Sequence, residues 1–186
     1  MKQQTVPRVA YGIFMDDVNQ ANVSRAIGGI TSATNNGTKE VHLMLQTTGG
    51  LISDAVAFHS FFCALVGTGI DLTLYNTGYV ASAGITVFLG AKKRVASPHS
   101  MFMIHRSTWG TPGAAVPMLE NQARMLQMED DRSFAIWRDY LKLLPEKWMQ
   151  IEQRELWLTP ADALECGLAT EIGEFAPPPG TPIGKV

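Results

Sequence analysis

The segment Val41–Gln46 constrains the fold of this chain more than any other. It is apolar at nearly every position rather than at alternate positions, which predicts a strand covered on both faces, as in a parallel sheet. Parallel strands need long crossover connections, which are usually helices. Gly49-Gly50 follows directly, and a helix expected over about 53–66, capped by Ser53 or Asp54, comes next. The segment therefore predicts a strand–loop–helix unit of an α/β fold.

The rest of the chain repeats this alternation of strands and helices. Short apolar runs predict strands at 8–15, 70–75, 94–96 and 100–104, and helical spacing of apolar residues predicts helices at about 16–33, 117–144 and 146–153. Thr159 and Asp162 have the spacing of a capped helix start. We expect one domain over residues 1–175, followed by a Pro/Gly-rich tail at 176–186 that is disordered.

Composition narrows the classes of function. The net charge of −2 gives no electrostatic reason to expect a nucleic acid or an anionic membrane as partner. Cys63 and Cys166 show neither a CxxC pattern nor metal-ligand spacing, and we interpret both as buried free thiols. No metal or cofactor site is indicated. The first residues lack the apolar core of a secretory signal, so we expect a cytoplasmic protein.

Ser82 is a candidate nucleophile. Ala81, Ala83 and Gly84 surround it, and small residues allow a strand to turn sharply into a helix and present a serine hydroxyl at the turn. Val80 stands where the strict GxSxG pattern has glycine. Taken alone, the segment is as compatible with a tightly packed helix start as with a nucleophile.

His105 is the best candidate base among the four histidines. It ends the apolar strand Met101–Ile104, and a strand is a rigid platform for a functional side chain. The alternative is a strand-end histidine bonded only to backbone. His42 and His59 have apolar surroundings typical of structural histidines, and His99 follows Pro98 in an expected loop.

The glycine pair Gly49-Gly50 completes a possible set. Glycines at the end of a buried strand allow backbone N–H groups to face a substrate carbonyl, although a tight turn between strand and helix is the commoner explanation of such a pair taken alone. A nucleophile, a base and an oxyanion-binding loop are the parts that acyl transfer by serine requires.

The order of these segments resembles the ClpP family of self-compartmentalised serine peptidases. The segments that carry the resemblance are Gln46-Thr47-Thr48-Gly49-Gly50, then Ala81-Ser82-Ala83-Gly84, then Met103-Ile104-His105. The later stretch Leu156–Ala163 is similar to the Arg-Phe-Leu-Ser-Ala-Pro-Glu-Ala pattern of that family. The resemblance extends from about residue 9 to residue 172.

The resemblance implies a role for each site residue. Ser82 would attack the scissile carbonyl, and His105 would act as general base and then as general acid. The backbone N–H groups of Gly50 and Ala83 would form the oxyanion hole, supported by Gly49. Glu155 falls where the family has an aspartate that completes the triad. A solvated carboxylate beside Arg154 is the alternative for Glu155, and Asp139 and Asp162 are weaker candidates for the acid.

The resemblance also implies an architecture and partners. It implies a ββα superhelix with a strand–helix handle over about 108–144, and heptameric rings stacked as a tetradecamer around a chamber that receives peptides or unfolded proteins. An AAA+ unfoldase is a family partner, but the segment before the first strand is short, which counts against dependence on one.

Two other functions stay open: a catalytically weak scaffold or regulatory subunit, and a crotonase-type acyl-CoA enzyme, which shares the superhelix. A Ser–Lys peptidase using Lys92 or Lys93 is less favoured.

Overall fold

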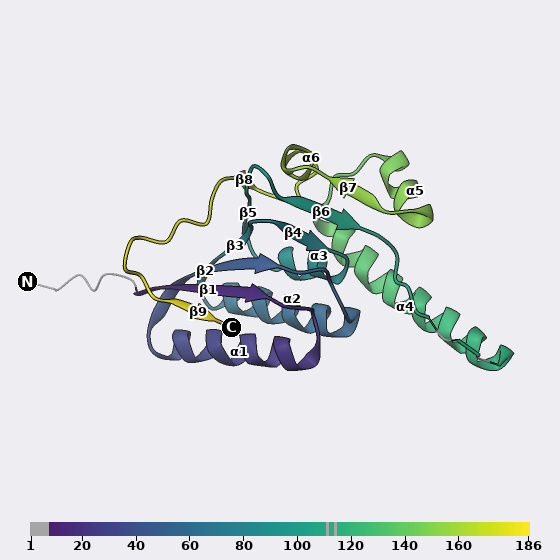
Figure 1. The fold of residues 1–186 in the computed structure, drawn as a ribbon, viewed down its shortest axis with the longest axis horizontal. Helices are drawn as coiled ribbons and strands as arrows, with labels where there is room; N and C mark the ends of the chain where they lie inside the picture. Colours follow the sequence, from purple (N-terminus) through teal and green to yellow (C-terminus); the bar gives the residue numbers. More distant parts are fainter. Residues whose placement is uncertain (1–7, 111, 114) are drawn as a thin grey trace, which may run out of the picture.

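A six-stranded parallel sheet is the main element of the computed structural model, which describes residues 8–110, 112–113 and 115–186 (Figure 1). The strand order is β8-β5-β3-β2-β1-β9, and every pairing is parallel. The strands are β1 (Arg8–Met15), β2 (Thr38–Gln46), β3 (Asp71–Asn76), β5 (Lys93–Ala96), β8 (Glu171–Ile172) and β9 (Ile183–Lys185). The parallel α/β fold expected from Val41–Gln46 is confirmed.

A second, three-stranded sheet has the order β4-β6-β7. It contains β4 (Tyr79–Ala81), β6 (Met101–Ile104) and β7 (Leu156–Leu158). β4 pairs with β6 in parallel, and β6 pairs with β7 antiparallel. An isolated parallel bridge between Thr47 and Val80 joins β4 to the end of β2. The two sheets therefore meet at the carboxyl end of β2, the edge of a parallel sheet at which ligands usually bind.

Six helices pack with the sheets in the described part of the chain. They are α1 (Gln20–Asn35), α2 (Ile52–Gly67), α3 (Ala83–Phe88), α4 (Val116–Tyr140), α5 (Pro145–Gln153) and α6 (Pro160–Glu165). α1 and α2 run side by side along the large sheet, whereas α4 extends away from the body (Figure 1). No described helix combines the length and the apolar character needed to cross a bilayer.

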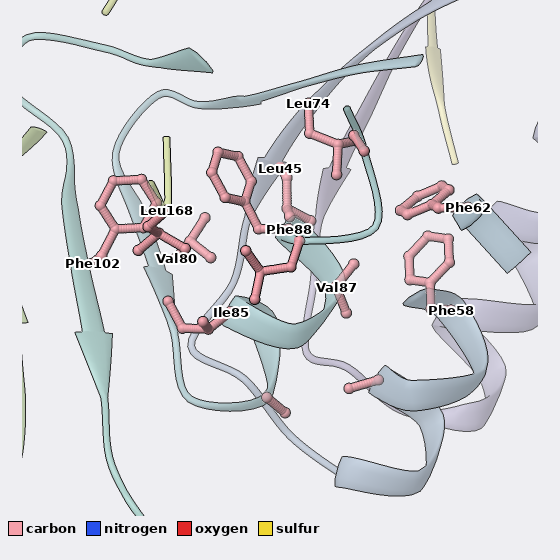
Figure 2. Packing of buried hydrophobic residues seen from close by; sticks show 14 of the residues in the cluster. Leu45, Phe58, Phe62, Leu74, Val80, Ile85, Val87, Phe88, Phe102 and Leu168 are labelled. Atoms are coloured by element: carbon pink, nitrogen blue, oxygen red, sulfur yellow. The ribbon is translucent and has the colours of Figure 1, made fainter. Parts of the chain in front are cut away.

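The short helix α3 lies in the middle of the core (Figure 2). All six of its residues are buried. Phe88 packs on Phe102 of β6 with ring centroids 5.4 Å apart, and on the other side Phe58 and Phe62 of α2 form a pair at 4.3 Å. Close packing on all sides leaves little room for this helix to shift, so the residue that begins it has a fixed position.

The start of α2 differs from the expectation. Its N-cap is Leu51, whose side chain makes no capping hydrogen bond, rather than Ser53 or Asp54. The backbone N–H of Leu51 instead donates to the carbonyl of Val18 at 2.8 Å. A backbone bond to the segment that follows β1 therefore sets where this helix begins. The Thr159–Asp162 capping box at α6 is confirmed.

The handle consists of a helix alone in the described residues. Between β6 and α4 the described residues of segment 105–115 form no strand, and α4 ends at Tyr140 instead of 144. Pro112 cannot donate a ladder hydrogen bond, and Gly110 and Gly113 disfavour a strand. The strand expected there is therefore not found among the described residues of the segment, which exclude residues 111 and 114.

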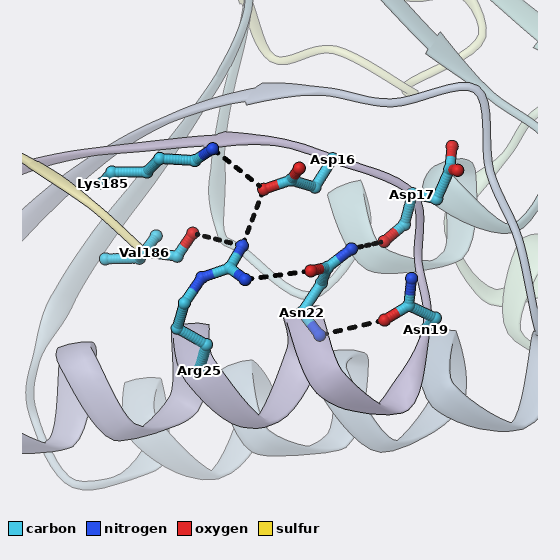
Figure 3. Close-up of polar contacts among 7 residues, drawn as sticks. All are labelled: Asp16, Asp17, Asn19, Asn22, Arg25, Lys185 and Val186. Carbon is cyan, nitrogen blue, oxygen red and sulfur yellow. Dashed lines mark hydrogen bonds and ion pairs between the residues drawn. The ribbon is translucent and has the colours of Figure 1, made fainter.

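The tail at 176–186 is ordered, contrary to expectation. β9 pairs with β1 at Tyr11–Ile183, Gly12–Gly184 and Ile13–Lys185, and side chains fix its end (Figure 3). The Arg25 guanidinium bonds to the Asp16 carboxylate at 2.6 Å and to the Val186 carbonyl at 3.4 Å. The Pro and Gly content of the tail predicts disorder. The unpaired backbone groups at the edge of β1, however, can hydrogen-bond to the tail and order it as β9.

The two cysteines are both free, but only one is buried. Cys166 is buried, whereas Cys63 is exposed on α2. The expectation of a buried thiol is therefore wrong for Cys63, because the apolar residues around it in sequence face the core while its own side chain does not.

Candidate active site

Three segments distant in sequence meet at the carboxyl end of β2. Thr47 N–H donates to the Tyr79 carbonyl at 2.9 Å, and Ala81 N–H donates back to the Thr47 carbonyl at 3.1 Å. On the other side of β4, Ser82 N–H donates to the Met103 carbonyl of β6 at 2.8 Å. These backbone bonds bring the glycine loop, the serine turn and the end of β6 to one place.

Ser82 occupies a strained backbone position. Its φ of 55° and ψ of −127° make it the one non-glycine residue with positive φ among the described residues. Such a conformation costs on the order of 1–3 kcal/mol and persists only where the surroundings impose it. A β-carbon on Gly84 would lie 2.4 Å from Thr47 Cγ2, and one on Gly49 would lie 2.6 Å from Ser82 Cβ. The small residues around Ser82 are therefore required by space.

The Ser82 hydroxyl is hydrogen-bonded to His105. Ser82 Oγ and His105 Nε2 are 2.8 Å apart. His105 follows directly on β6, whose preceding residues are held by β4 and β7. An imidazole at this distance can accept the hydroxyl proton, which is the first requirement of an activated serine nucleophile.

Two backbone N–H groups near this pair, those of Gly50 and Ala83, have no hydrogen-bond acceptor among the described residues. Gly49 accepts from Val18 N–H at 2.7 Å and Leu51 donates to Val18 O at 2.8 Å, so this bridge leaves the N–H of Gly50 between them unused. Ala83 is the first residue of α3 and has no intrahelical acceptor. Neither N–H bonds to another described residue. A β-carbon on Gly50, whose φ is +147°, would overlap the Val18 carbonyl.

A cleft of about 340 Å³ opens beside the serine and histidine. Its walls come from the glycine loop and start of α2, the segment after His105, and one face of α4. The lining residues are Gly50, Leu51, Ile52, Ser53, Ser82, His105, Ser107, Thr108, Trp109, Met125, Leu126 and Glu129. This mainly apolar lining suits an apolar group bound beside Ser82.

Comparison with known proteins gives the family of this chain. The family model described as Clp protease matches residues 10–175. The chain belongs to the Clp protease family. It is 25% identical to an ATP-dependent Clp protease proteolytic subunit of Paracoccus denitrificans over 150 residues, which cover 80% of this chain and 73% of that protein. It is 29% identical to proteolytic subunit 2 of Treponema pallidum over 139 residues, covering 74% and 68%.

A solved Clp structure has the same fold. The chain superposes on a point mutant of ClpP1 from Listeria monocytogenes with a TM-score of 0.75, covering 90% of this chain and 92% of that one, at 20% identity. This similarity confirms the ClpP-type α/β fold expected from the sequence.

Glu155, which the resemblance assigns as the acid, lies near Tyr79 of β4 and has no hydrogen bond to His105 in the described structure. It is exposed, and its carboxylate accepts from the Trp157 indole at 2.9 Å. Trp157 stacks on Tyr79 with ring centroids 5.9 Å apart. Burial raises the pKa of Tyr79, and the Glu155 charge raises it further. In the described part of the chain no carboxylate is hydrogen-bonded to His105.

The other acidic candidates have separate structural positions. Asp162 accepts from the backbone and hydroxyl of Thr159 at 2.9 and 2.6 Å, and these bonds hold its pKa below the ordinary value. Asp139 is exposed on α4. Lys92 and Lys93 are exposed and line a different pocket, on the far end of β3.

The other three histidines have contacts away from Ser82. The ring of His42 bonds to Tyr75 at 2.8 Å and to Glu40 at 2.7 Å. His59 bonds through Nδ1 to the Thr86 carbonyl at 3.0 Å, and burial lowers its pKa. His99 is exposed. His105 is therefore the histidine that the fold brings to the serine.

Asp130 is a buried charged residue that the sequence did not single out. It lies on α4, is 4% exposed, and accepts hydrogen bonds from Arg106 and Ser107, the two residues after His105. In sequence it is the middle of Glu129-Asp130-Asp131, and nothing in that run distinguishes the buried member from its exposed neighbour.

Proposed function

We propose that this chain is a ClpP-type serine endopeptidase that hydrolyses peptides or unfolded proteins through an acyl-enzyme. The 2.8 Å contact between Ser82 Oγ and His105 Nε2, on a strained turn beside free backbone N–H groups, carries the proposal. Membership of the Clp protease family supports a peptide substrate.

The proposed reaction begins with proton transfer from Ser82 Oγ to His105 Nε2 as the oxygen attacks the scissile carbonyl carbon. The N–H groups of Gly50 and Ala83 stabilise the negative oxygen of the tetrahedral intermediate. His105 then donates its proton to the leaving amine, and the C–N bond breaks. Water, deprotonated by His105, attacks the acyl-enzyme in the second half and releases Ser82.

Glu155 is the proposed orienting acid of this reaction. In that role its carboxylate would accept from His105 Nδ1, hold the ring in the correct tautomer and stabilise the imidazolium. The side chain is exposed and bonded only to Trp157 Nε1, so it would have to exchange the indole for the imidazole. A change of side-chain rotamer is a low-cost step for an exposed residue.

We also propose that the protein works as a homo-oligomer, with heptameric rings stacked as a tetradecamer. The support is an exposed apolar surface on α4, the protruding helix in Figure 1. Its members are Val116, Met118, Leu119, Met125 and Met128, each between 40% and 66% exposed. An exposed apolar surface of this kind marks a protein–protein contact. An AAA+ unfoldase is not required for peptide hydrolysis in this proposal.

A second candidate is a scaffold or regulatory subunit with weak catalysis. The specific observation that favours it is that Glu155 bonds to Trp157 and not to His105. Such a subunit would form the oligomer but would turn over peptide slowly.

Labelling with a fluorophosphonate tests the proposed function. The reagent forms an Oγ–P bond and releases fluoride only where a serine is activated, and intact mass counts the adducts. We expect one adduct per chain on Ser82, none in Ser82→Ala or His105→Ala, and a loss of peptidase kcat of roughly a millionfold in Ser82→Ala.

Ser53→Ala is the matched control, because Ser53 lines the same cleft. It should retain the adduct and the activity. An adduct that survives Ser82→Ala would contradict the proposal. An unlabelled wild type whose native mass shows a complete oligomer would favour the scaffold subunit instead.

A further inference from the structure

Asp130 and Asp131 are neighbours on α4 with opposite environments. Asp130 is 4% exposed, whereas Asp131 is exposed and accepts from the Gln127 side chain at 2.8 Å. Removing a carboxylate from water is costly unless hydrogen bonds and charge compensate. The burial of Asp130 therefore requires partners that an exposed helix residue does not need.

The partners of Asp130 are the two residues that follow His105. Its Oδ1 accepts from the Ser107 backbone N–H at 2.7 Å, and its Oδ2 accepts from Arg106 Nε at 2.7 Å. Hydrogen bonds to a carboxylate at this distance are among the strong ones. The chain leaving His105 is thus attached to α4 at two consecutive residues.

α4 is itself fixed to the helix that begins after Ser82. The indole N–H of Trp137, a buried residue on α4, donates to Thr86 Oγ1 of α3 at 3.0 Å. Helix α4 therefore contacts α3 through Trp137 and residues 106–107 through Asp130. Every residue of α3 is buried, so α3 has little room to move. The bond between α4 and α3 therefore fixes the position of the Asp130 carboxylate relative to Ser82.

The His105 ring itself has one hydrogen bond in the described structure, to Ser82 Oγ. Its position consequently depends on the backbone on either side. Before His105, β6 is held by its pairing with β4 and β7. After His105, no described strand or helix begins until α4. The restraint on that side comes from side chains of α4: Asp130 makes two short charged bonds, and Gln127 Oε1 accepts a longer one from the Arg106 guanidinium at 3.2 Å.

We propose that Asp130 is a positioning residue of His105: its carboxylate holds residues 106–107 against α4 and thereby keeps the imidazole at bonding distance from Ser82. This inference rests on the proposed function, in which His105 is the base. Asp130 does not touch the reacting atoms, and its effect is transmitted through the backbone. Displacing a catalytic group by about 1 Å can cost on the order of a hundredfold in rate.

The test compares Asp130→Asn with Asp131→Asn in the full chain. Asparagine can still accept from Ser107 N–H, but its NH₂ group cannot accept from Arg106 and its charge is lost. We expect the fluorophosphonate labelling rate constant of Asp130→Asn to fall about tenfold to a hundredfold, with the end point still one adduct per chain. In peptide hydrolysis kcat should fall while KM stays constant. Asp131→Asn should stay within about twofold of wild type, as expected of an exposed position.

The end point separates positioning from folding. A purely structural role would lower the number of labelled chains and the melting temperature but leave the rate constant of the folded chains unchanged. That result, or an unchanged rate in Asp130→Asn, would overturn the inference. Asp130→Glu keeps the charge and displaces it by one methylene. If the asparagine variant does not fold, Asp130→Glu replaces it in the test, and we again expect a lower labelling rate constant than in wild type.

The ¹⁵N resonances of the His105 ring provide a readout independent of activity. They should shift in Asp130→Asn and stay in place in Asp131→Asn. A shift together with an unlabelled wild type would uphold the positioning role and contradict the proposed function. If the wild type is labelled but Asp130→Asn shows unshifted resonances and an unchanged labelling rate, the proposed function stands and the positioning role of Asp130 is contradicted.

Discussion

The serine side and the acid side of this site differ in how firmly the fold holds them. On the serine side, Ser82 sits in a strained turn against Gly49 and bonds to His105 at 2.8 Å. On the acid side, Glu155 is exposed and bonded to an exposed Trp157. Close steric contact holds the serine side, whereas one hydrogen bond at the surface holds the Glu155 carboxylate on the acid side.

This difference indicates where chemistry is fixed in the monomer and where it can still change. A buried, close-packed turn has no alternative arrangement nearby. An exposed carboxylate can exchange one donor for another at a cost of about a hydrogen bond. In the proposed reaction, the contact needed for attack is therefore already formed in the single chain, while the orientation of His105 by an acid still depends on a side chain that can move.

The largest effect should come from filling the space on the serine side. In Gly49→Ala the new β-carbon would lie 2.6 Å from Ser82 Cβ and 3.0 Å from the Ala81 carbonyl, at a φ of +106°. We expect labelling of Ser82 to be lost and the free energy of unfolding to fall by roughly 2–4 kcal/mol. Intact mass after fluorophosphonate treatment and chemical denaturation measure the two effects.

Gly37→Ala is the matched control for that substitution. Gly37 also has a positive φ, +92°, but no atom lies within 4 Å of an added β-carbon. It should lose only about 1 kcal/mol from the backbone conformation and should label normally. Equal behaviour of the two variants would show that the crowding at Ser82 does not matter.

The firm side is also the side that the sequence could predict. Gly49, Ser82 and Gly84 have to be small because a β-carbon at either glycine meets Ser82 or Thr47, and such restrictions leave a local motif. The buried strand Val41–Gln46 predicted the parallel sheet for the same reason, since burial on both faces dictates residue type. His105 was identified by its place at the end of an apolar strand.

The next largest effect concerns Glu155. If it orients His105, Glu155→Gln should lower peptidase kcat by about 10² to 10⁴, since an amide favours the wrong tautomer. Trp157→Phe removes the competing indole donor and keeps an aromatic ring on Tyr79. We expect kcat to rise severalfold, because an exposed hydrogen bond of about 1 kcal/mol no longer holds the carboxylate away.

The two variants are expected to change kcat in opposite directions, Glu155→Gln lowering it and Trp157→Phe raising it. Steady-state kinetics on a peptide substrate measures both changes. If kcat is the same as wild type in Glu155→Gln and in Trp157→Phe, the acid side takes no part in the reaction, and the site works as a Ser–His pair.

What the sequence did not predict depends on contacts between distant segments. Burial of Asp130 follows from the meeting of α4 with residues 106–107, and its run of three acidic residues carries no sign of it. The order of the tail depends on the free edge of β1, which Ile183–Lys185 covers. The handle strand expected after His105 is not found among the described residues, where Pro112, Gly110 and Gly113 disfavour a strand.

The smallest effect should be a difference in how acid affects the two sides. Burial lowers the pKa of His59, which lies behind α3 on the serine side, below its ordinary 6.5. Below about pH 6.5 the unfolded chain therefore binds a proton at His59 that the folded chain does not. The free energy of unfolding is unaffected by His59 above that pH and falls as the pH decreases below it, by at most about 1.4 kcal/mol per pH unit.

Asp162, near the acid side, has a pKa held below its ordinary 3.8 by Thr159, so its contribution is lost only as the pH falls below that value. Mild acid should weaken the serine side first. His59→Asn can keep the bond to the Thr86 carbonyl and does not titrate; its free energy of unfolding between pH 7 and 5 should be flatter than that of wild type. Identical slopes in urea denaturation would mean that His59 does not link protonation to the packing of α3, and that the serine side is held by steric contact alone.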